Sequence, residues 1–156
     1  KIGIETHIPH FPTIEPVTSL ESWREVLEQY DQFINEESII IGHSLGVSIG
    51  LNILEEHKVK AAFCIATAWG DVQNEFTKIM SSISSQQYRW DDVKKNCSHV
   101  EILHADNDPY LPIERAETLA KHFEAKVNII SGAGHFNEEA GYKDFPLLLE
   151  RIQKII

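Results

Sequence analysis

A serine, an aspartate and a histidine occur along the chain at positions that suit nucleophilic catalysis. The serine is Ser44, which lies within Gly-His-Ser-Leu-Gly at residues 42–46 and fits the pattern G-x-S-x-G. A serine hydroxyl is a weak nucleophile near neutral pH, because it needs a histidine to accept its proton and an acid to orient that histidine. The chain must therefore supply both partners after Ser44, first the acid and then the histidine.

The surroundings of Ser44 predict a sharp turn from a strand into a helix, the nucleophile elbow. A β-branched run at residues 39–41 precedes the turn, and an apolar stretch follows it. We expect Gly42 and Gly46 to be required because neighbouring chain comes close to both. The turn would expose the Ser44 hydroxyl and leave the Leu45 N–H free to donate to an oxyanion. The competing interpretation is a glycine-bordered turn whose serine caps the helix.

His135 is the predicted base. It lies in Ser-Gly-Ala-Gly-His-Phe at residues 131–136, directly after the last expected strand, where a glycine-rich turn can carry an imidazole over the strand ends. The other histidines are expected to be surface or packing residues. His7 and His10 have a spacing found in metal sites, but no nearby cysteine or carboxylate completes a ligand set, so we predict no metal site.

Two aspartates, Asp106 and Asp108, follow the apolar run at residues 99–103 and either could be the acid. We favour Asp108 because Pro109 fixes the backbone after it and Leu-Pro at residues 111–112 leads into the next helix. Asp106 is the alternative. It could instead support its loop through bonds to backbone N–H groups, a common role of aspartate in turns.

The elements that must position these residues alternate between strands and helices. Buried apolar runs predict strands, and the segments between them can hold helices. Strands are expected at residues 2–4, 38–41, 61–66, 99–103 and 126–130, and helices at about 20–34, 45–57 and from about 113. Continuous apolar runs are typical of strands buried on both faces of a parallel sheet. The sequence therefore predicts an α/β fold with a mostly parallel sheet and helices on both faces.

The longest connection, residues 67–96, is expected to form a short cap segment within a single domain at residues 1–156. A chain of 156 residues has room for one core. The aromatic residues of the connection could cap a pocket or cover the sheet edge, and both interpretations remain open. As lining of a substrate pocket we expect His43, Trp69 and Phe136.

Composition and charge exclude several classes of function. The formal net charge of −10 opposes binding to nucleic acid or to an anionic membrane surface. No apolar run is long enough to span a membrane, and the first residues do not resemble a signal peptide. Cys64 and Cys97 are too few for a disulfide scaffold, so we expect reduced thiols and a soluble cytoplasmic protein.

Four blocks of the sequence resemble the α/β-hydrolase superfamily. Within it they are most similar to the small serine hydrolases related to retinoblastoma-binding protein nine and the YdeN-like proteins. The blocks lie at residues 39–46, 88–97, 107–112 and 132–137, in the order found in that family. The elbow is common to many hydrolases, whereas the second and third blocks are more specific to this branch. The resemblance implies a three-layer α/β-hydrolase sandwich.

The resemblance also implies roles for particular residues: Ser44 as nucleophile, Asp108 as acid and His135 as base. Members of the family usually begin with a strand and a His-Gly loop that supplies a second oxyanion donor, and nothing in this sequence corresponds to it. Since the chain begins at Lys1 and runs directly into an expected strand, we expect the first strand and helix of the fold to be missing.

Two functions follow as hypotheses. The first is a serine hydrolase that cleaves small-molecule carboxylic esters, or less readily amides or thioesters, through an acyl-Ser44 intermediate. It would need no metal or organic cofactor and would act as a monomer or weak dimer. The alternative is a non-catalytic module that binds a protein partner through exposed aromatic residues such as Trp69 and Trp90.

Overall fold

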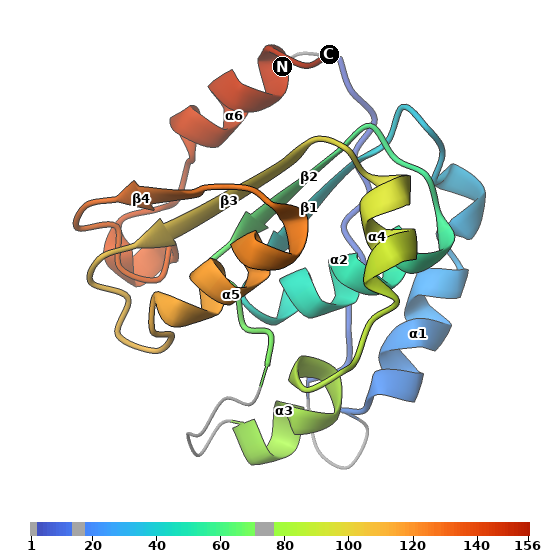
Figure 1. The fold of residues 1–156 in the computed structure, drawn as a ribbon, viewed down its shortest axis with the longest axis horizontal. Coiled ribbons are helices and arrows are strands. Elements are labelled where there is room, and N and C mark those ends of the chain that lie inside the picture. The colour runs from blue at the N-terminus through green and yellow to red at the C-terminus, as the bar shows by residue number, and fades with distance from the viewer. Residues whose placement is uncertain (1–2, 14–17, 71–76) are drawn as a thin grey trace.

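Four parallel strands form the centre of the computed structural model, which describes residues 3–13, 18–70 and 77–156. The strands are β1 (Ile39–His43), β2 (Ala61–Ile65), β3 (Val100–Ala105) and β4 (Val127–Ile130). Their order in the sheet is the same as their order in the chain. The carboxyl ends of all four strands therefore lie at the same end of the sheet, and the segments that follow the strands meet there (Figure 1).

The helices lie on both faces of the sheet, as the sequence predicts. The helical segments are α1 (Leu20–Glu28), η1 (Asp31–Phe33), α2 (Leu45–Glu56), α3 (Thr77–Ser84), α4 (Trp90–Asn96), α5 (Glu114–Phe123), η2 (Glu138–Ala140) and α6 (Pro146–Gln153). Crossovers between neighbouring parallel strands are right-handed, so α2, α4 and α5 share one face. After the last strand the chain crosses over, and α6 covers the other face (Figure 1). The result is the expected three-layer α/β fold.

The core has one apolar cluster on each face of the sheet. Toward α2, α4 and α5, Cys64 and Ile102 pack with Leu51, Val93 and Leu119. On the other face, the sheet contributes Phe63, Ile65 and Leu103 to a second cluster. Against them pack three partly buried residues of α6: Leu147, Leu148 and Ile152. Every residue of β2 is buried, which confirms the prediction of burial on both faces for this strand.

Burial on both faces is wrong for the strands at the edges of the sheet. Ile41 in β1 is 50% exposed and Ile129 in β4 is 44% exposed. The two side chains lie on opposite faces of the sheet, since Ile41 shares the face of Ile39, toward α6, and Ile129 shares the face of Val127, toward α5. Both are exposed because the edge strands β1 and β4 each have only one neighbouring strand among the described residues. An apolar run therefore predicts a strand without fixing its place in the sheet.

The N-terminal predictions hold only in part. Residues 3–13 contain no strand, and residues 1–2 lie outside the described part of the chain. Gly3 has φ +72°, which does not suit a strand. The predicted helix from about residue 20 begins with a capping box between Ser19 and Ser22, which confirms its start. It ends at Glu28 and continues only as the short 3₁₀ turn η1.

None of the helices in the described residues is both long and apolar enough to cross a membrane.

Candidate active site

Ser44 lies at the junction of β1 and α2 with φ 54° and ψ −121°. A side chain rarely accompanies such backbone angles, and the strain costs about 1–3 kcal/mol. The Ser44 side chain makes no capping hydrogen bond to α2, so the interpretation of this serine as an ordinary helix cap is wrong. The turn presents the hydroxyl as a nucleophile elbow would.

Glycine is sterically required at only one of the two predicted positions. A Cβ on Gly42 would lie 2.7 Å from the Cα of Val47 and 2.8 Å from the carbonyl oxygen of Gly46. A Cβ on Gly46 would meet no heavy atom within 4 Å among the described residues, the backbone of its own helix aside. The expected steric requirement therefore holds for Gly42 and is wrong for Gly46.

Both backbone polar groups of Ser44 are held by β2 and the residues after it. The Ser44 N–H donates to the carbonyl of Ile65 at 2.9 Å, and the Ala68 N–H donates to the carbonyl of Ser44 at 3.3 Å. Ala66, between these two partners, has φ +46°, which turns the chain back toward the elbow. Leu45 is the first residue of α2, so its N–H has no acceptor within the helix.

Asp108 and His135 form a hydrogen-bonded pair beyond the ends of β3 and β4. The Nδ1 atom of His135 lies 2.8 Å from Oδ2 of Asp108, and their side chains are 12% and 1% exposed. The other carboxylate oxygen of Asp108 accepts the backbone N–H groups of Tyr110 at 2.9 Å and Leu111 at 3.1 Å. Burial acts to raise the pKa of Asp108, but these hydrogen bonds outweigh it and hold the pKa below the usual value of 3.8.

Asp106 takes the supporting role that was left open for it. Its carboxylate accepts the Ser131 hydroxyl at 2.7 Å and the Gly132 N–H at 2.8 Å. The Gly132 N–H, and after it the Ser131 hydroxyl, lower the pKa of Asp106. Asp106 thus ties the loop of Asp108 to the loop of His135, whereas the carboxylate that contacts the imidazole is that of Asp108.

Three more side chains fix the loop of His135 or its ring. The Asn107 side chain accepts the N–H of Gly134 at 2.8 Å. The Tyr110 ring meets the His135 ring edge to face, with 5.0 Å between centroids. Neither Asn107 nor Tyr110 is predicted from the sequence to have a role, and the signal for both is their place in the loop that carries the acid. His43 donates from Nε2 to the carbonyl of His135 at 2.7 Å.

The contact of His43 brings the loop of His135 next to the residue that precedes Ser44. The two imidazole rings are tilted, with 4.8 Å between their centroids. Burial lowers the pKa of His43 from 6.5, although the hydrogen bond to the carbonyl of His135 acts to raise it. His43, expected as pocket lining, therefore contributes to holding His135 in place.

Trp69 and Phe136, the other two residues expected to line the pocket, are nearly buried. Phe136 is 7% exposed and packs on Tyr142 and Phe145. Trp69 is 9% exposed and donates its indole N–H to the carbonyl of Gln86 at 3.0 Å. Both rings therefore pack within the core, where Trp69 holds the chain at Gln86 and Phe136 holds the loop that follows His135.

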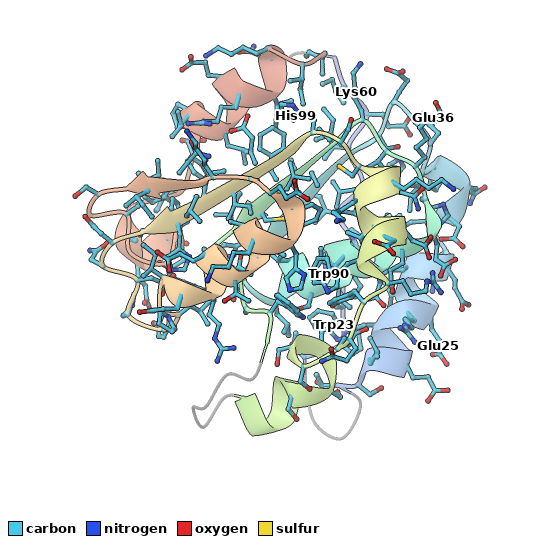
Figure 2. All side chains as sticks on the ribbon, viewed as in Figure 1. Trp23, Glu25, Glu36, Lys60, Trp90 and His99 are labelled. Atoms are coloured by element: carbon cyan, nitrogen blue, oxygen red, sulfur yellow. The ribbon has the colours of Figure 1, made fainter. Side chains whose placement is uncertain are left out.

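The aromatic residues of the long connection also pack together. Trp90 lies between α4 and α5 (Figure 2). Its ring stacks on that of His122 of α5 with 3.9 Å between centroids, and 5.0 Å separate the ring centroids of Trp69 and Trp90. Residues 71–76 of this connection, Phe76 among them, lie outside the described part of the chain. Trp69 and Trp90 thus extend the core on the α5 face of the sheet.

Comparison with known proteins decides the family. The family model described as serine hydrolase matches residues 9–154. The chain belongs to the serine hydrolase family. Serine hydrolase RBBP9 of Rattus norvegicus is 30% identical over 140 residues, which cover 86% of this chain and 74% of that protein.

The fold of this serine hydrolase is shared by solved structures of low sequence identity. The ydeN gene product of B. subtilis superposes with a TM-score of 0.80 at 17% identity, over 89% of this chain and 76% of that one. A meta-cleavage product hydrolase from Pseudomonas fluorescens IP01 gives a TM-score of 0.63 at 14% identity, over 92% and 75%. These likenesses show an α/β-hydrolase fold.

Proposed function

We propose that this serine hydrolase cleaves carboxylic esters through an acyl-Ser44 intermediate, with Asp108 and His135 completing a catalytic triad. The observation that carries the proposal is the 2.8 Å contact between Asp108 and Nδ1 of His135, in a loop that His43 joins to the elbow. A carboxylate can only accept, so Nδ1 carries the proton and Nε2 of His135 is free to act as a base.

In the first half of the reaction, Nε2 of His135 takes the Ser44 proton while Oγ attacks the ester carbonyl carbon. The Leu45 N–H donates to the oxyanion that forms. When this intermediate collapses, the bond to the alcohol breaks and the imidazolium gives its proton to the leaving oxygen. Water then attacks the acyl-serine by the same route, which releases the carboxylic acid and restores Ser44.

The charge of Asp108 stabilises the imidazolium that appears in both steps. Because its pKa is held below 3.8, this residue is a carboxylate at neutral pH. Esters are expected to react more readily than amides, because an alcohol is a better leaving group than an amine and depends less on proton donation by His135. The mechanism uses side chains and backbone N–H groups alone, and among the described residues no cluster of three His, Cys, Asp or Glu could hold a metal ion.

We also propose that the protein works in a reducing compartment such as the cytoplasm. Cys64 and Cys97 are both free and buried, which supports this assignment.

The test is hydrolysis of p-nitrophenyl acetate followed by mass spectrometry of the quenched enzyme. The wild type is expected to release p-nitrophenol in a burst and to carry one acetyl group on Ser44. Ser44→Ala should lower kcat/KM by roughly 10³-fold or more, whereas the control Ser98→Ala, on an exposed serine, should match the wild type. Retention of full activity by Ser44→Ala would refute the proposal.

A further inference from the structure

His104 is a fully buried imidazole that the proposed chemistry does not use. It lies near the end of β3, four residues before Asp108, and its side chain is 0% exposed. Its Nε2 atom lies 3.1 Å from the carbonyl oxygen of Leu111. Its Nδ1 atom has no hydrogen-bond partner among the described residues.

The contact of His104 leads directly to the carboxylate of Asp108. The carbonyl of Leu111 is held by His104, and the N–H of Leu111 donates to Oδ1 of Asp108 at 3.1 Å. The other oxygen of Asp108 holds His135 at 2.8 Å. Leu111 is itself buried, at 5% exposed. His104 is thus connected to Oδ1 of Asp108 through a single buried residue, Leu111, whose N–H group helps to orient the carboxylate.

The geometry also assigns the tautomer of His104. A carbonyl oxygen only accepts, so Nε2 must carry a proton. A second proton on Nδ1 would leave a buried N–H without an acceptor among the described residues, so we assign Nδ1 as the unprotonated nitrogen. A leucine at this position could fill the same space but could not hold the carbonyl of Leu111. A hydrogen bond to a backbone carbonyl of the acid loop is therefore what distinguishes His104 from an apolar core residue.

We propose that His104 is a positioning residue for the catalytic acid. Through the carbonyl of Leu111 it fixes the loop at residues 108–111, and so the distance from Asp108 to His135. This inference rests on the proposed function, because the orientation of His135 matters for catalysis only if Ser44 is the nucleophile.

The variants His104→Leu and His104→Gln separate positioning from packing. The amide nitrogen of glutamine lies the same number of bonds from Cα as Nε2 of histidine, so it can donate to Leu111, whereas leucine cannot. His104→Leu should lower kcat about tenfold or more and change KM less than about twofold. His104→Gln should recover most of kcat. As a control, Asn128→Leu removes a bond of 3.2 Å to the carbonyl of Ile102, and it should lower Tm with little effect on kcat.

Proton and nitrogen NMR of the imidazoles test the inference without any activity. In the wild type, His104 should show a protonated Nε2 and an unprotonated Nδ1, and the Nδ1 proton of His135 should resonate far downfield because Asp108 accepts it. His104→Leu should shift or broaden that downfield resonance, whereas Asn128→Leu and Ser44→Ala should retain it. If these signals behave so in a protein without esterase activity, the proposed function fails, whereas the part of the inference that stands is that His104 positions Asp108 against His135.

An unprotonated Nε2 on His104 in the wild type would overturn the inference, because the ring could then not donate to the carbonyl of Leu111. So would a His104→Leu protein that has a lower Tm but an unchanged kcat and an unchanged His135 resonance, because packing alone would then account for the residue.

Discussion

The charge on Asp108 and the backbone angles of Ser44 are the two residue-scale features on which the account depends. The strain at Ser44 is held by bonds from β2 and its following loop, with φ 54° and a 2.9 Å bond to Ile65. Asp108 is nearly buried, yet it stays ionised because three N–H groups point at its oxygens. The pair with His135 is therefore set in advance of substrate binding.

Asp108→Asn should lower kcat/KM by roughly 10⁴-fold at neutral pH, with KM changed much less. An amide can donate to Nδ1 and so favour the tautomer whose Nε2 carries the proton and cannot accept one from Ser44. Asp106→Asn, which loosens the loop without touching the imidazole, should cost far less. Steady-state kinetics of both variants with one ester check this, and a larger loss in Asp106→Asn would reassign the acid.

The same carboxylate predicts a pH dependence of stability. The pKa of Asp108 is lower in the folded protein than its usual 3.8, so ionisation favours the folded state above pH 3.8. This contribution is lost as the pH falls through the folded pKa. The free energy of unfolding should therefore be higher for the wild type than for Asp108→Asn at pH 7, and this difference should shrink below pH 4. Denaturant titrations at both pH values measure it.

His43 predicts a second pH dependence of stability, because the folded protein disfavours the protonated form of its imidazole. Burial holds its pKa below 6.5, so the unfolded chain takes up a proton first as the pH falls through 6.5. The wild type should therefore lose stability below that pH, and His43→Gln should lose less. Urea titrations between neutral pH and about pH 5 test this, and equal slopes for the two proteins would contradict it.

At the scale of elements, the turn between β1 and α2 depends on one glycine. Gly42→Ala should lower the free energy of unfolding by about 3 kcal/mol, because the new Cβ would lie 2.7 Å from the Cα of Val47. Gly46→Ala is the matched control in the same motif and should be neutral or slightly stabilising, since alanine favours a helix. Thermal or urea unfolding compares them, and equal losses would contradict the steric account.

Apart from the strand expected at residues 2–4, which the described residues 3–13 do not contain, the sequence was enough to predict the strands and that they run parallel, because runs such as residues 39–41 and 61–65 are short and apolar. It was not enough to place them in the sheet. Ile41 and Ile65 look alike in sequence, yet Ile41 is 50% exposed and Ile65 is 3% exposed. The difference depends on which strand has two neighbours, a tertiary property that local periodicity does not carry.

Candidate site residues could be predicted where the local sequence carries the chemistry. Ser44 stands in a motif with a steric reason, and His135 stands in a glycine-rich loop. The contact from Asn107 to Gly134 and that from His104 to Leu111 carry no such signal. They depend on how two loops at the ends of β3 and β4 approach one another, which only the assembled sheet determines.

At the scale of the whole molecule, the core on the α5 face encloses both thiols. Cys64 is 5% exposed and Cys97 is 2% exposed. Burial raises the pKa of Cys64 to about 12 and that of Cys97 to about 11. Both should therefore remain unreactive toward iodoacetamide at pH 8 in the folded protein and react in denaturant. Ser98→Cys supplies an exposed thiol as a positive control, and equally rapid labelling of the wild type would contradict the packing described.

The central claim, that Ser44 is an activated nucleophile, is tested most directly by labelling with a fluorophosphonate and measuring the intact mass. We expect one adduct on the wild type and on Ser98→Ala, mapped by peptide analysis to Ser44. Ser44→Ala should carry no adduct, and labelling of His135→Ala should be slowed by roughly 10²-fold or more. An adduct that persists in Ser44→Ala, or labelling of the wild type no faster than that of His135→Ala, would contradict it.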